Sequence, residues 1–180
     1  MTKSLLIVIG FFLTAACGVN DADKVKVMTD RRNMPLETGK NMVINYTDSG
    51  YVKAKIFAPM MERYANEERN ETVMKQGMTA YFLNKNKKVE SYLKSKYAIR
   101  LDRERKMVAR DDVILVNNKG DTLRTELLTW DETTQKIYTD KFIRITTPDQ
   151  IILGDGLESN TEFTEYKIFK IRGTINLKKP

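Results

Sequence analysis

The sequence predicts an all-β fold, and three observations support this. From about Met42 onward, apolar and polar residues alternate in short runs, as in Val52-Ala54-Ile56-Ala58, which is the period of a strand with one buried face. Turn-forming residues separate these runs. Long stretches with helical periodicity are lacking in the same region. The composition, 41% hydrophobic and 31% charged, is that of a globular body.

Residues 1–16 have the features of a secretory signal peptide. Lys3 supplies a positive start, residues 5–13 form an apolar run, and small residues then lead to Cys17. The run is too short to span a hydrocarbon core of about 30 Å as a mature helix. A single cysteine at this place resembles a bacterial lipoprotein signal, in which the cysteine is lipidated and becomes the new N-terminus. The alternative is an ordinary signal peptide followed by an incidental thiol.

Residues 17–40 contain few large apolar side chains and include Pro35 and Gly39. This segment is therefore predicted to be a tether between the lipidated N-terminus and a folded domain that spans residues 41–180.

Within that domain, four polar turns recur roughly 30 residues apart, each between two apolar runs. They are Thr47-Asp48-Ser49-Gly50, Asn84-Lys85-Asn86-Lys87, Asn117-Asn118-Lys119-Gly120 and Thr147-Pro148-Asp149-Gln150. The interval predicts a repeated hairpin, and stacked hairpins bury a continuous face that one copy could not bury alone.

Residues 89–101 are ambiguous, because Val89, Leu93, Tyr97 and Leu101 recur every four residues and suit a helix face or a strand face. Small and apolar residues fill the odd positions between them, while charged residues occupy even positions. That alternation favours a strand with its odd side inward.

Residues that could do chemistry are sparse. The chain has no His and only one Cys, which excludes Ser–His and Cys–His mechanisms, an intramolecular disulfide and most zinc sites. The carboxylate pairs Asp111-Asp112 and Asp155 with Glu158 lie in strand-like or glycine-flanked sequence, where neighbours point to opposite faces. We therefore expect no enzyme, no cofactor and no metal site.

The net charge of +7 is spread along the chain without a long block of like charge. Such an excess fits a surface that meets anionic lipid or phosphate, and it is also common on plain solvated surfaces. The cluster Arg100, Arg103, Arg105, Lys106 and Arg110 is interleaved with acids, which favours a solvated hairpin tip. Nucleic-acid binding is not expected of an exported protein.

Several stretches of the body, in order, resemble the LptC family of lipopolysaccharide-export proteins over residues 41–168. They are Asn45–Lys55, Ala58–Tyr64, Asn118–Asp121, Thr125-Glu126, Leu128, Trp130-Asp131, Lys136–Asp149 and Gly154–Ser159, the last matching a glycine-flanked turn with Gly154 and Gly156.

The resemblance implies a twisted, partly open antiparallel β-jellyroll of the β-taco, OstA-like type with an apolar interior. It also implies lipopolysaccharide as cargo, an inner-membrane ABC transporter complex as donor, and a periplasmic bridge protein of related fold as acceptor. Many relatives are held by an N-terminal transmembrane helix, whereas Cys17 is expected to anchor this chain by lipid to the periplasmic face of the inner membrane.

If the interior is a trough for acyl chains, inward strand positions line it. Alternation gives these candidates: Val52, Ala54, Ile56, Phe82, Val89, Leu93, Val113, Leu115, Leu123, Ile143, Ile145 and Leu153. The same residues could instead pack as an ordinary sandwich core. The last strands, residues 163–175, are expected to offer an unpaired edge to the next bridge protein.

Two other functions remain open at this stage. One is a lipid-anchored structural adaptor that uses the same strand edges but carries no lipid. The other is a carbohydrate-active β-sandwich enzyme that uses Asp111, Asp112 or Glu158.

Overall fold

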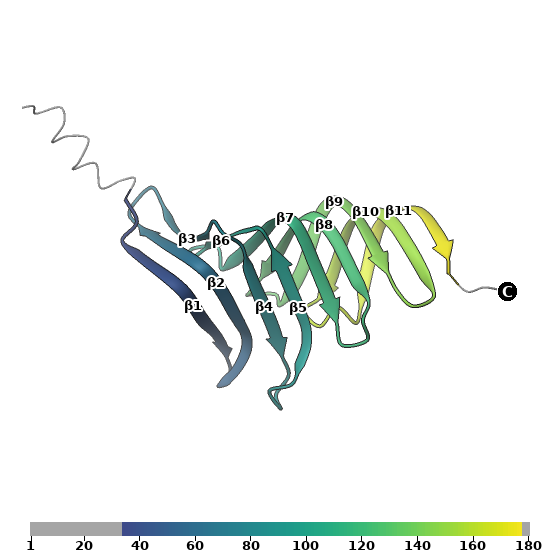
Figure 1. Cartoon of the computed structure of the whole chain (residues 1–180), viewed down its shortest axis with the longest axis horizontal. Helices are drawn as coiled ribbons and strands as arrows, with labels where there is room; N and C mark the ends of the chain where they lie inside the picture. Colours follow the sequence, from purple (N-terminus) through teal and green to yellow (C-terminus); the bar gives the residue numbers. More distant parts are fainter. Residues whose placement is uncertain (1–33, 178–180) are drawn as a thin grey trace, which may run out of the picture. The chain divides into compact units, whose positions relative to one another are not determined.

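The computed structural model of the protein describes residues 34–177, which form one antiparallel sheet of eleven strands (Figure 1). The predicted signal peptide and Cys17 lie outside the described residues. No helix in the described part is long and apolar enough to cross a membrane. The strands are β1 (Glu37–Asp48), β2 (Tyr51–Ala65), β3 (Asn70–Met74), β4 (Met78–Leu83), β5 (Val89–Ser95), β6 (Tyr97–Leu101), β7 (Lys106–Asn117), β8 (Thr122–Asp131), β9 (Lys136–Thr146), β10 (Gln150–Asn160) and β11 (Tyr166–Asn176).

The chain runs up and down the sheet, so neighbours in sequence are mostly neighbours in space. From β7 onward the order is β7-β8-β9-β10-β11. On the other side, β2 pairs with both β3 and β4, and β7 pairs with both β5 and β6. β3 and β4 are therefore two halves of one long strand, and β5 and β6 are two halves of the next.

The all-β prediction is confirmed, and so are its four turns. The turns at residues 49–50, 84–88, 118–121 and 147–149 each join two paired strands. The strand prediction for residues 89–101 is also confirmed, with one correction. The segment breaks at Lys96, and the fully buried position in β6 is the even-numbered Ala98. The odd positions thus stop being the buried side at the break.

The domain boundary differs from the expected one, because β1 begins at Glu37, four residues before the expected start at residue 41. Gly39 lies inside this strand, opposite Met61 of β2. Residues 37–41 of β1 are mostly exposed. Their sequence therefore lacks the alternation of apolar and polar residues that would predict a strand.

A line of backbone irregularities crosses the sheet near the middle of its long strands. Gly77, between β3 and β4, has φ +85°. Asp111 and Asp112 in β7 have φ 64° and 56°, and Gly156 in β10 has φ 72°. The pairing of β8 with β9 shifts register between residues 125 and 129. Lys96 links two of these places, because a side chain at Gly77 would meet its backbone and its N–H donates to the Asp111 carbonyl over 2.9 Å. We call this line the crease.

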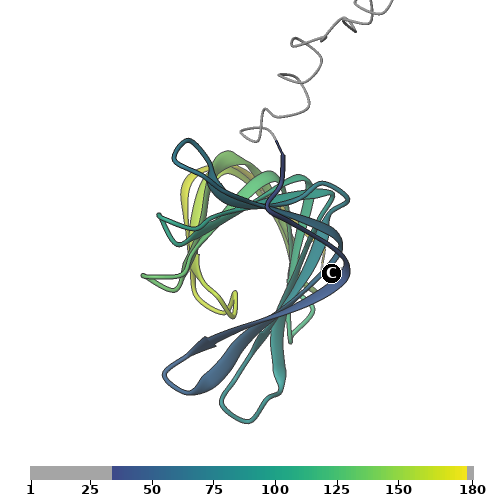
Figure 2. The same ribbon diagram turned by 90° about the vertical axis from the view of Figure 1, so that its left-hand side faces the viewer.

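The sheet folds over at the crease, which brings the two halves of the strands face to face (Figure 2). Side chains far apart in the sheet then meet. The rings of Phe82 in β4 and Trp130 in β8 contact edge to face, with centroids 5.1 Å apart. The Ser91 hydroxyl in β5 donates to the Thr161 carbonyl beyond β10 over 2.6 Å. Bulges allow such bending because they leave a residue unpaired and increase the local twist.

The sheet is open, because its two outer strands pair on one side only. Among the described residues, β1 pairs with β2 alone and β11 pairs with β10 alone. The structure is therefore a folded, twisted jellyroll and not a closed barrel, as the sequence predicted.

Candidate functional site

The space between the two halves is apolar, and nine of the twelve predicted groove residues face it. Their exposed fractions are 3% or less, and they belong to one continuous core cluster. They are Ala54, Ile56, Phe82, Leu93, Val113, Leu115, Leu123, Ile143 and Ile145. Period-two alternation therefore identified the inward face correctly along β2, β4, β5 and β7 to β9.

The other three candidates do not line the interior in this way. Val89 is 48% exposed, because it lies at the start of β5 where the pairing with β4 is irregular. Leu153 lies opposite the exposed Arg144 of β9 and so is on the outer face, whereas its neighbour Ile152 packs on the core. Val52 is half-buried beside the β1–β2 turn.

Gly154 and Gly156 do not form the expected turn, because both lie within β10. A side chain at Gly154 would come within 2.7 Å of the Lys170 carbonyl oxygen, and one at Gly156 within 2.8 Å of the Phe169 ring. The two glycines allow β10 and β11 to approach closely where the strand crosses the crease.

At the β1 end of the interior, a cavity of about 580 Å³ opens between the two halves. We call it the mouth. Its size is within the range of ligand-binding pockets. Its apolar lining residues come from four strands, β1, β2, β3 and β7, and include three flexible methionines. They are Ile44, Tyr46, Ile56, Met61, Met74 and Met107.

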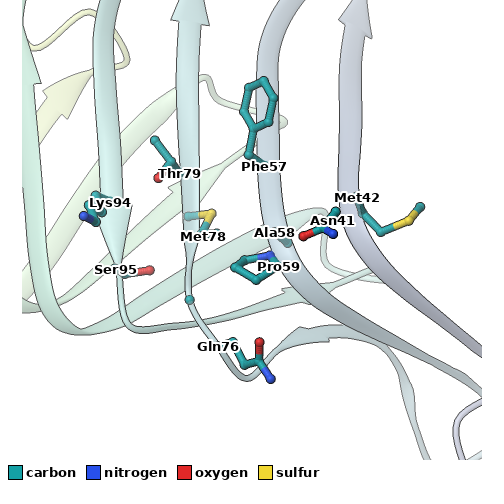
Figure 3. Close-up of a pocket in the computed structure, with 11 residues that line it drawn as sticks. Asn41, Met42, Phe57, Ala58, Pro59, Gln76, Met78, Thr79, Lys94 and Ser95 are labelled. Atoms are coloured by element: carbon teal, nitrogen blue, oxygen red, sulfur yellow. The ribbon is translucent and has the colours of Figure 1, made fainter.

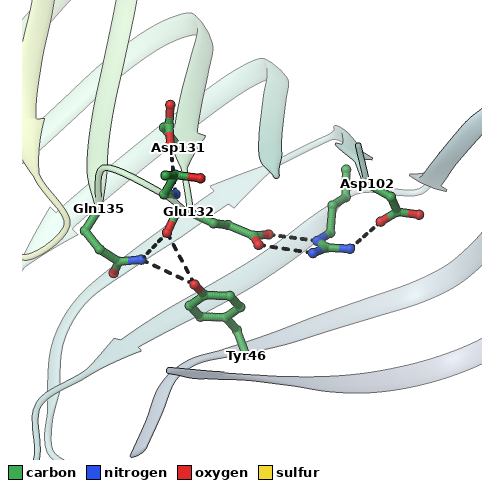
Figure 4. A network of polar contacts seen from close by, with 7 residues as sticks. Tyr46, Asp102, Asp131, Glu132 and Gln135 are labelled. Carbon is green, nitrogen blue, oxygen red and sulfur yellow. Dashed lines mark hydrogen bonds and ion pairs between the residues drawn. The ribbon is translucent and has the colours of Figure 1, made fainter. Parts of the chain in front are cut away.

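A polar network crosses the mouth and joins three separate parts of the sheet (Figure 4). Arg100 of β6 donates to both carboxylate oxygens of Glu132, from Nε over 2.7 Å and from Nη2 over 3.1 Å. Arg100 also pairs with Asp102. The Tyr46 hydroxyl of β1 donates to the Glu132 carbonyl over 3.3 Å, and the Gln135 amide donates to the same carbonyl over 2.8 Å.

The two charged partners at the centre of this network differ in burial. The side chain of Glu132 is 2% exposed and that of Arg100 is 33% exposed. The hydrogen bond that Arg100 donates to Glu132 raises the pKa of Arg100 above its usual value, against the opposite effect of burial. A buried carboxylate is tolerated only with such a partner, so Glu132 depends on Arg100 more than Arg100 depends on Glu132.

Aromatic side chains form the inner wall behind this network. Trp130 is 1% exposed and contacts Tyr46 and Phe82 edge to face, each with centroids 5.1 Å apart. Its indole Nε1 is the one buried side-chain polar atom in residues 34–177 without a hydrogen-bond partner. Trp130 therefore packs in the core near the end of β8.

Sequence reasoning missed the residues that hold the mouth. It placed Arg100 on a solvated hairpin tip, and although the tip exists at residues 102–105, Arg100 lies inside the mouth. Glu132 follows β8 in a turn, and its burial carries no local signal because its partner is 32 residues away. Arg100 gave no sign either, because an even-numbered charged residue fits the predicted alternation, and only the break at Lys96 places it on the same side as the buried Ala98.

A second cavity of about 320 Å³ lies against the crease between β1, β2, β4 and β5 (Figure 3). Its lining includes the exposed Phe57, Lys94 and Gln76 as well as the half-buried Thr79. Phe57 is 42% exposed, whereas its neighbours Ile56 and Ala58 are buried. This cavity therefore adjoins the outer face of the sheet.

The acidic residues considered for catalysis are held in ion pairs or in the crease. Glu158 pairs with Lys136 and Asp155 with Arg172, each over 2.5 Å. Asp112 lies 3.3 Å from Lys96. No group of three potential ligands in residues 34–177 could hold a metal ion. The mouth therefore presents an apolar lining beneath a polar rim.

The model of one protein family matches the chain. Its description is "LptC: Lipopolysaccharide-assembly, LptC-related", and the match covers residues 5–175. No curated protein matches the chain.

Proposed function

The chain belongs to the LptC-related family of lipopolysaccharide-assembly proteins, and we propose that it is the lipopolysaccharide-binding component of an envelope export bridge. In this role it accepts lipopolysaccharide from an inner-membrane ABC transporter and passes it to a periplasmic bridge protein. The family acts in lipopolysaccharide transport at the periplasmic side of the inner membrane and is not a known enzyme family.

The single observation that carries the proposal is the apolar interior with an opening at one end. Each acyl CH₂ exposed to water costs about 0.8 kcal/mol, so a chain of a dozen carbons needs apolar cover throughout its passage. The core cluster supplies such a surface from β2 to β10, and the mouth gives access to it.

The charge of the mouth determines which part of the lipid enters. Its lining contains two basic residues, Arg63 and Arg100, and three acidic ones, Glu37, Asp102 and Glu132. Because Arg100 is already neutralised by two acids, the mouth does not attract phosphate. The acyl chains occupy the interior, and the phosphorylated head remains in solvent.

Most of the interior is filled by side chains, so acyl chains can pass only if the two halves separate. The sheet allows this, because its hydrogen-bonded ladders run within the folded sheet and β1 is not paired with β11. The halves meet mainly through side chains, as at Phe82 and Trp130. Separation at the mouth therefore breaks few backbone hydrogen bonds.

The β11 edge is the proposed contact with the next bridge protein. Ile171 and Ile175 are 62% and 52% exposed, and the strand has no partner on its outer side in the described part. Pairing with an incoming strand would satisfy its free backbone groups. Substitution of both isoleucines by Lys should reduce capture of the bridge protein, whereas capture at the wild-type level would exclude this edge.

Photo-crosslinking tests the transport role. A photo-reactive residue in place of Ile56, which faces the mouth and is 2% exposed, should crosslink to lipopolysaccharide. The same residue in place of Glu126 of β8, which is exposed, is the matched control. The alternative, favoured by the nine closely packed core residues, is an adaptor without lipid cargo. In that case neither position would crosslink, although the chain still captured the bridge protein.

A further inference from the structure

The outer face of the folded sheet carries two rows of side chains that contain no acid. Residues directly opposite in register share a face. The first row is Val43, Phe57, Thr79, Lys94, Ile114, Arg124, Arg144 and Leu153. The second row is Lys55, Tyr81, Tyr92, Val116, Thr122, Thr146 and Ile151. We call these two rows the outer strip.

The outer strip has four cations, Lys55, Lys94, Arg124 and Arg144, among apolar and aromatic residues. Arg124 and Arg144 lie directly opposite each other, an arrangement of like charges that destabilises an isolated sheet. The nearest acid, Asp112, is 3.9 Å from Arg124. Because this long ion pair offsets little of the repulsion between the two facing arginines, they favour binding to an anionic partner.

The aromatic members indicate the type of anionic partner. Phe57 and Tyr92 are 42% and 37% exposed. The rings of Phe57 and Tyr81 meet at 89°, and those of Tyr81 and Tyr92 at 42°, so they form no flat platform for stacking on sugars. Exposed aromatic rings among Lys and Arg are typical of the lipid headgroup region, whereas the dry centre of a protein interface is poor in Lys.

We propose that the outer strip docks on an anionic phospholipid bilayer. The proposal rests on the proposed function, in which Cys17 is the expected anchor. Cys17 lies 17 residues before the first described residue, and a chain of that length spans at most about 60 Å. An anchor at Cys17 therefore keeps the folded body, and with it the strip, near a bilayer. The cavity beside Phe57 and Lys94 is a recess within the docked face. Docking holds the body along the membrane surface.

Fluorescence quenching by brominated lipids tests the docking. The full chain carries Phe57→Trp, which places an indole in the outer strip, and is mixed with vesicles of brominated phosphatidylglycerol or brominated phosphatidylcholine. The only native tryptophan, Trp130, is buried and gives the background. Phe169→Trp on β11, at a position 58% exposed and outside the strip, is the matched reporter. Only Phe57→Trp with phosphatidylglycerol should be quenched, and 0.5 M salt should abolish the effect.

Removal of positive charges from the outer strip is the second test of docking. Arg124→Gln with Arg144→Gln should lower the ratio of docked to undocked protein roughly thirtyfold, at about a factor of five for each cation. Lys167→Gln with Lys170→Gln removes the same charge outside the strip and should change the ratio less than about threefold. Equal quenching with both lipids, or no effect of the arginine pair, would overturn the proposal. Docking needs neither an acyl anchor nor bound cargo, so crosslinking at Ile56 can fail independently.

Discussion

The ion pair at the mouth predicts an asymmetry between two substitutions. Arg100→Met removes the partner of Glu132, whose side chain is 2% exposed, and leaves a buried charge without a counter-ion. Glu132→Gln leaves Arg100 33% exposed and still paired with Asp102. Removing one partner of a buried pair costs about 3–5 kcal/mol. Since solvent reaches Arg100, we expect about 3 kcal/mol for Arg100→Met and about 1 kcal/mol for Glu132→Gln.

Urea unfolding followed by tryptophan fluorescence measures both values, because Trp130 is the only tryptophan and is buried. The reasoning is refuted if the two variants lose equal stability, or if Arg100→Met loses less than about 1 kcal/mol.

Three further predictions concern the core, the crease and the anchor. Leu115→Ala, at a fully buried position, should lower the free energy of unfolding by about 2–5 kcal/mol, and its outward neighbour Val116→Ala should cost clearly less in the same urea titration. Gly77→Ala should destabilise more than Gly120→Ala, although both have φ near +85°, because a side chain at Gly77 would come within 2.4 Å of the Ser95 carbonyl while Gly120 faces open space; equal melting temperatures would contradict this. Cys17→Ser should remove the mass of a lipid and, in 0.5 M salt, which also abolishes docking of the outer strip, should move the protein from the membrane to the soluble fraction; a variant of unchanged mass would exclude lipidation.

The sequence predicted most of the fold because the information is local. Alternation identifies Ile143 and Ile145 as inward without knowledge of their neighbours, and the polar turns mark the ends of strands. It failed at Leu153, because Ile151, Ile152 and Leu153 are all apolar and do not show which side chain points inward. The register shift after Asp155 also reverses the alternation along the same strand. Strand breaks such as Lys96 have the same effect and show no distinctive residue type.

The candidate site was harder to predict, because its polar residues are paired across the fold. Arg100 and Glu132 are both charged residues near strand ends, where exposure is the usual outcome. The pairing of β6 with β7 and of β7 with β8 brings Arg100 and the β8–β9 turn together, although 32 residues of sequence separate the two partners. The apolar lining was predictable from alternation, whereas the polar rim that controls access to it was not.

The packed interior and the transport role are compatible only if the mouth can open, and Tyr46 tests this. Its hydroxyl joins β1 to the Glu132 carbonyl in the β8–β9 turn, while its ring packs on Trp130. Tyr46→Phe keeps the ring and removes the bond, at a cost of about 0.5–1.5 kcal/mol. If separation of the halves limits loading, Tyr46→Phe should accelerate crosslinking of lipopolysaccharide at Ile56, whereas Tyr92→Phe on the outer face should not. An unchanged rate would mean that lipid enters the interior at another place, because removal of the hydrogen bond between Tyr46 and Glu132 would then not speed its entry.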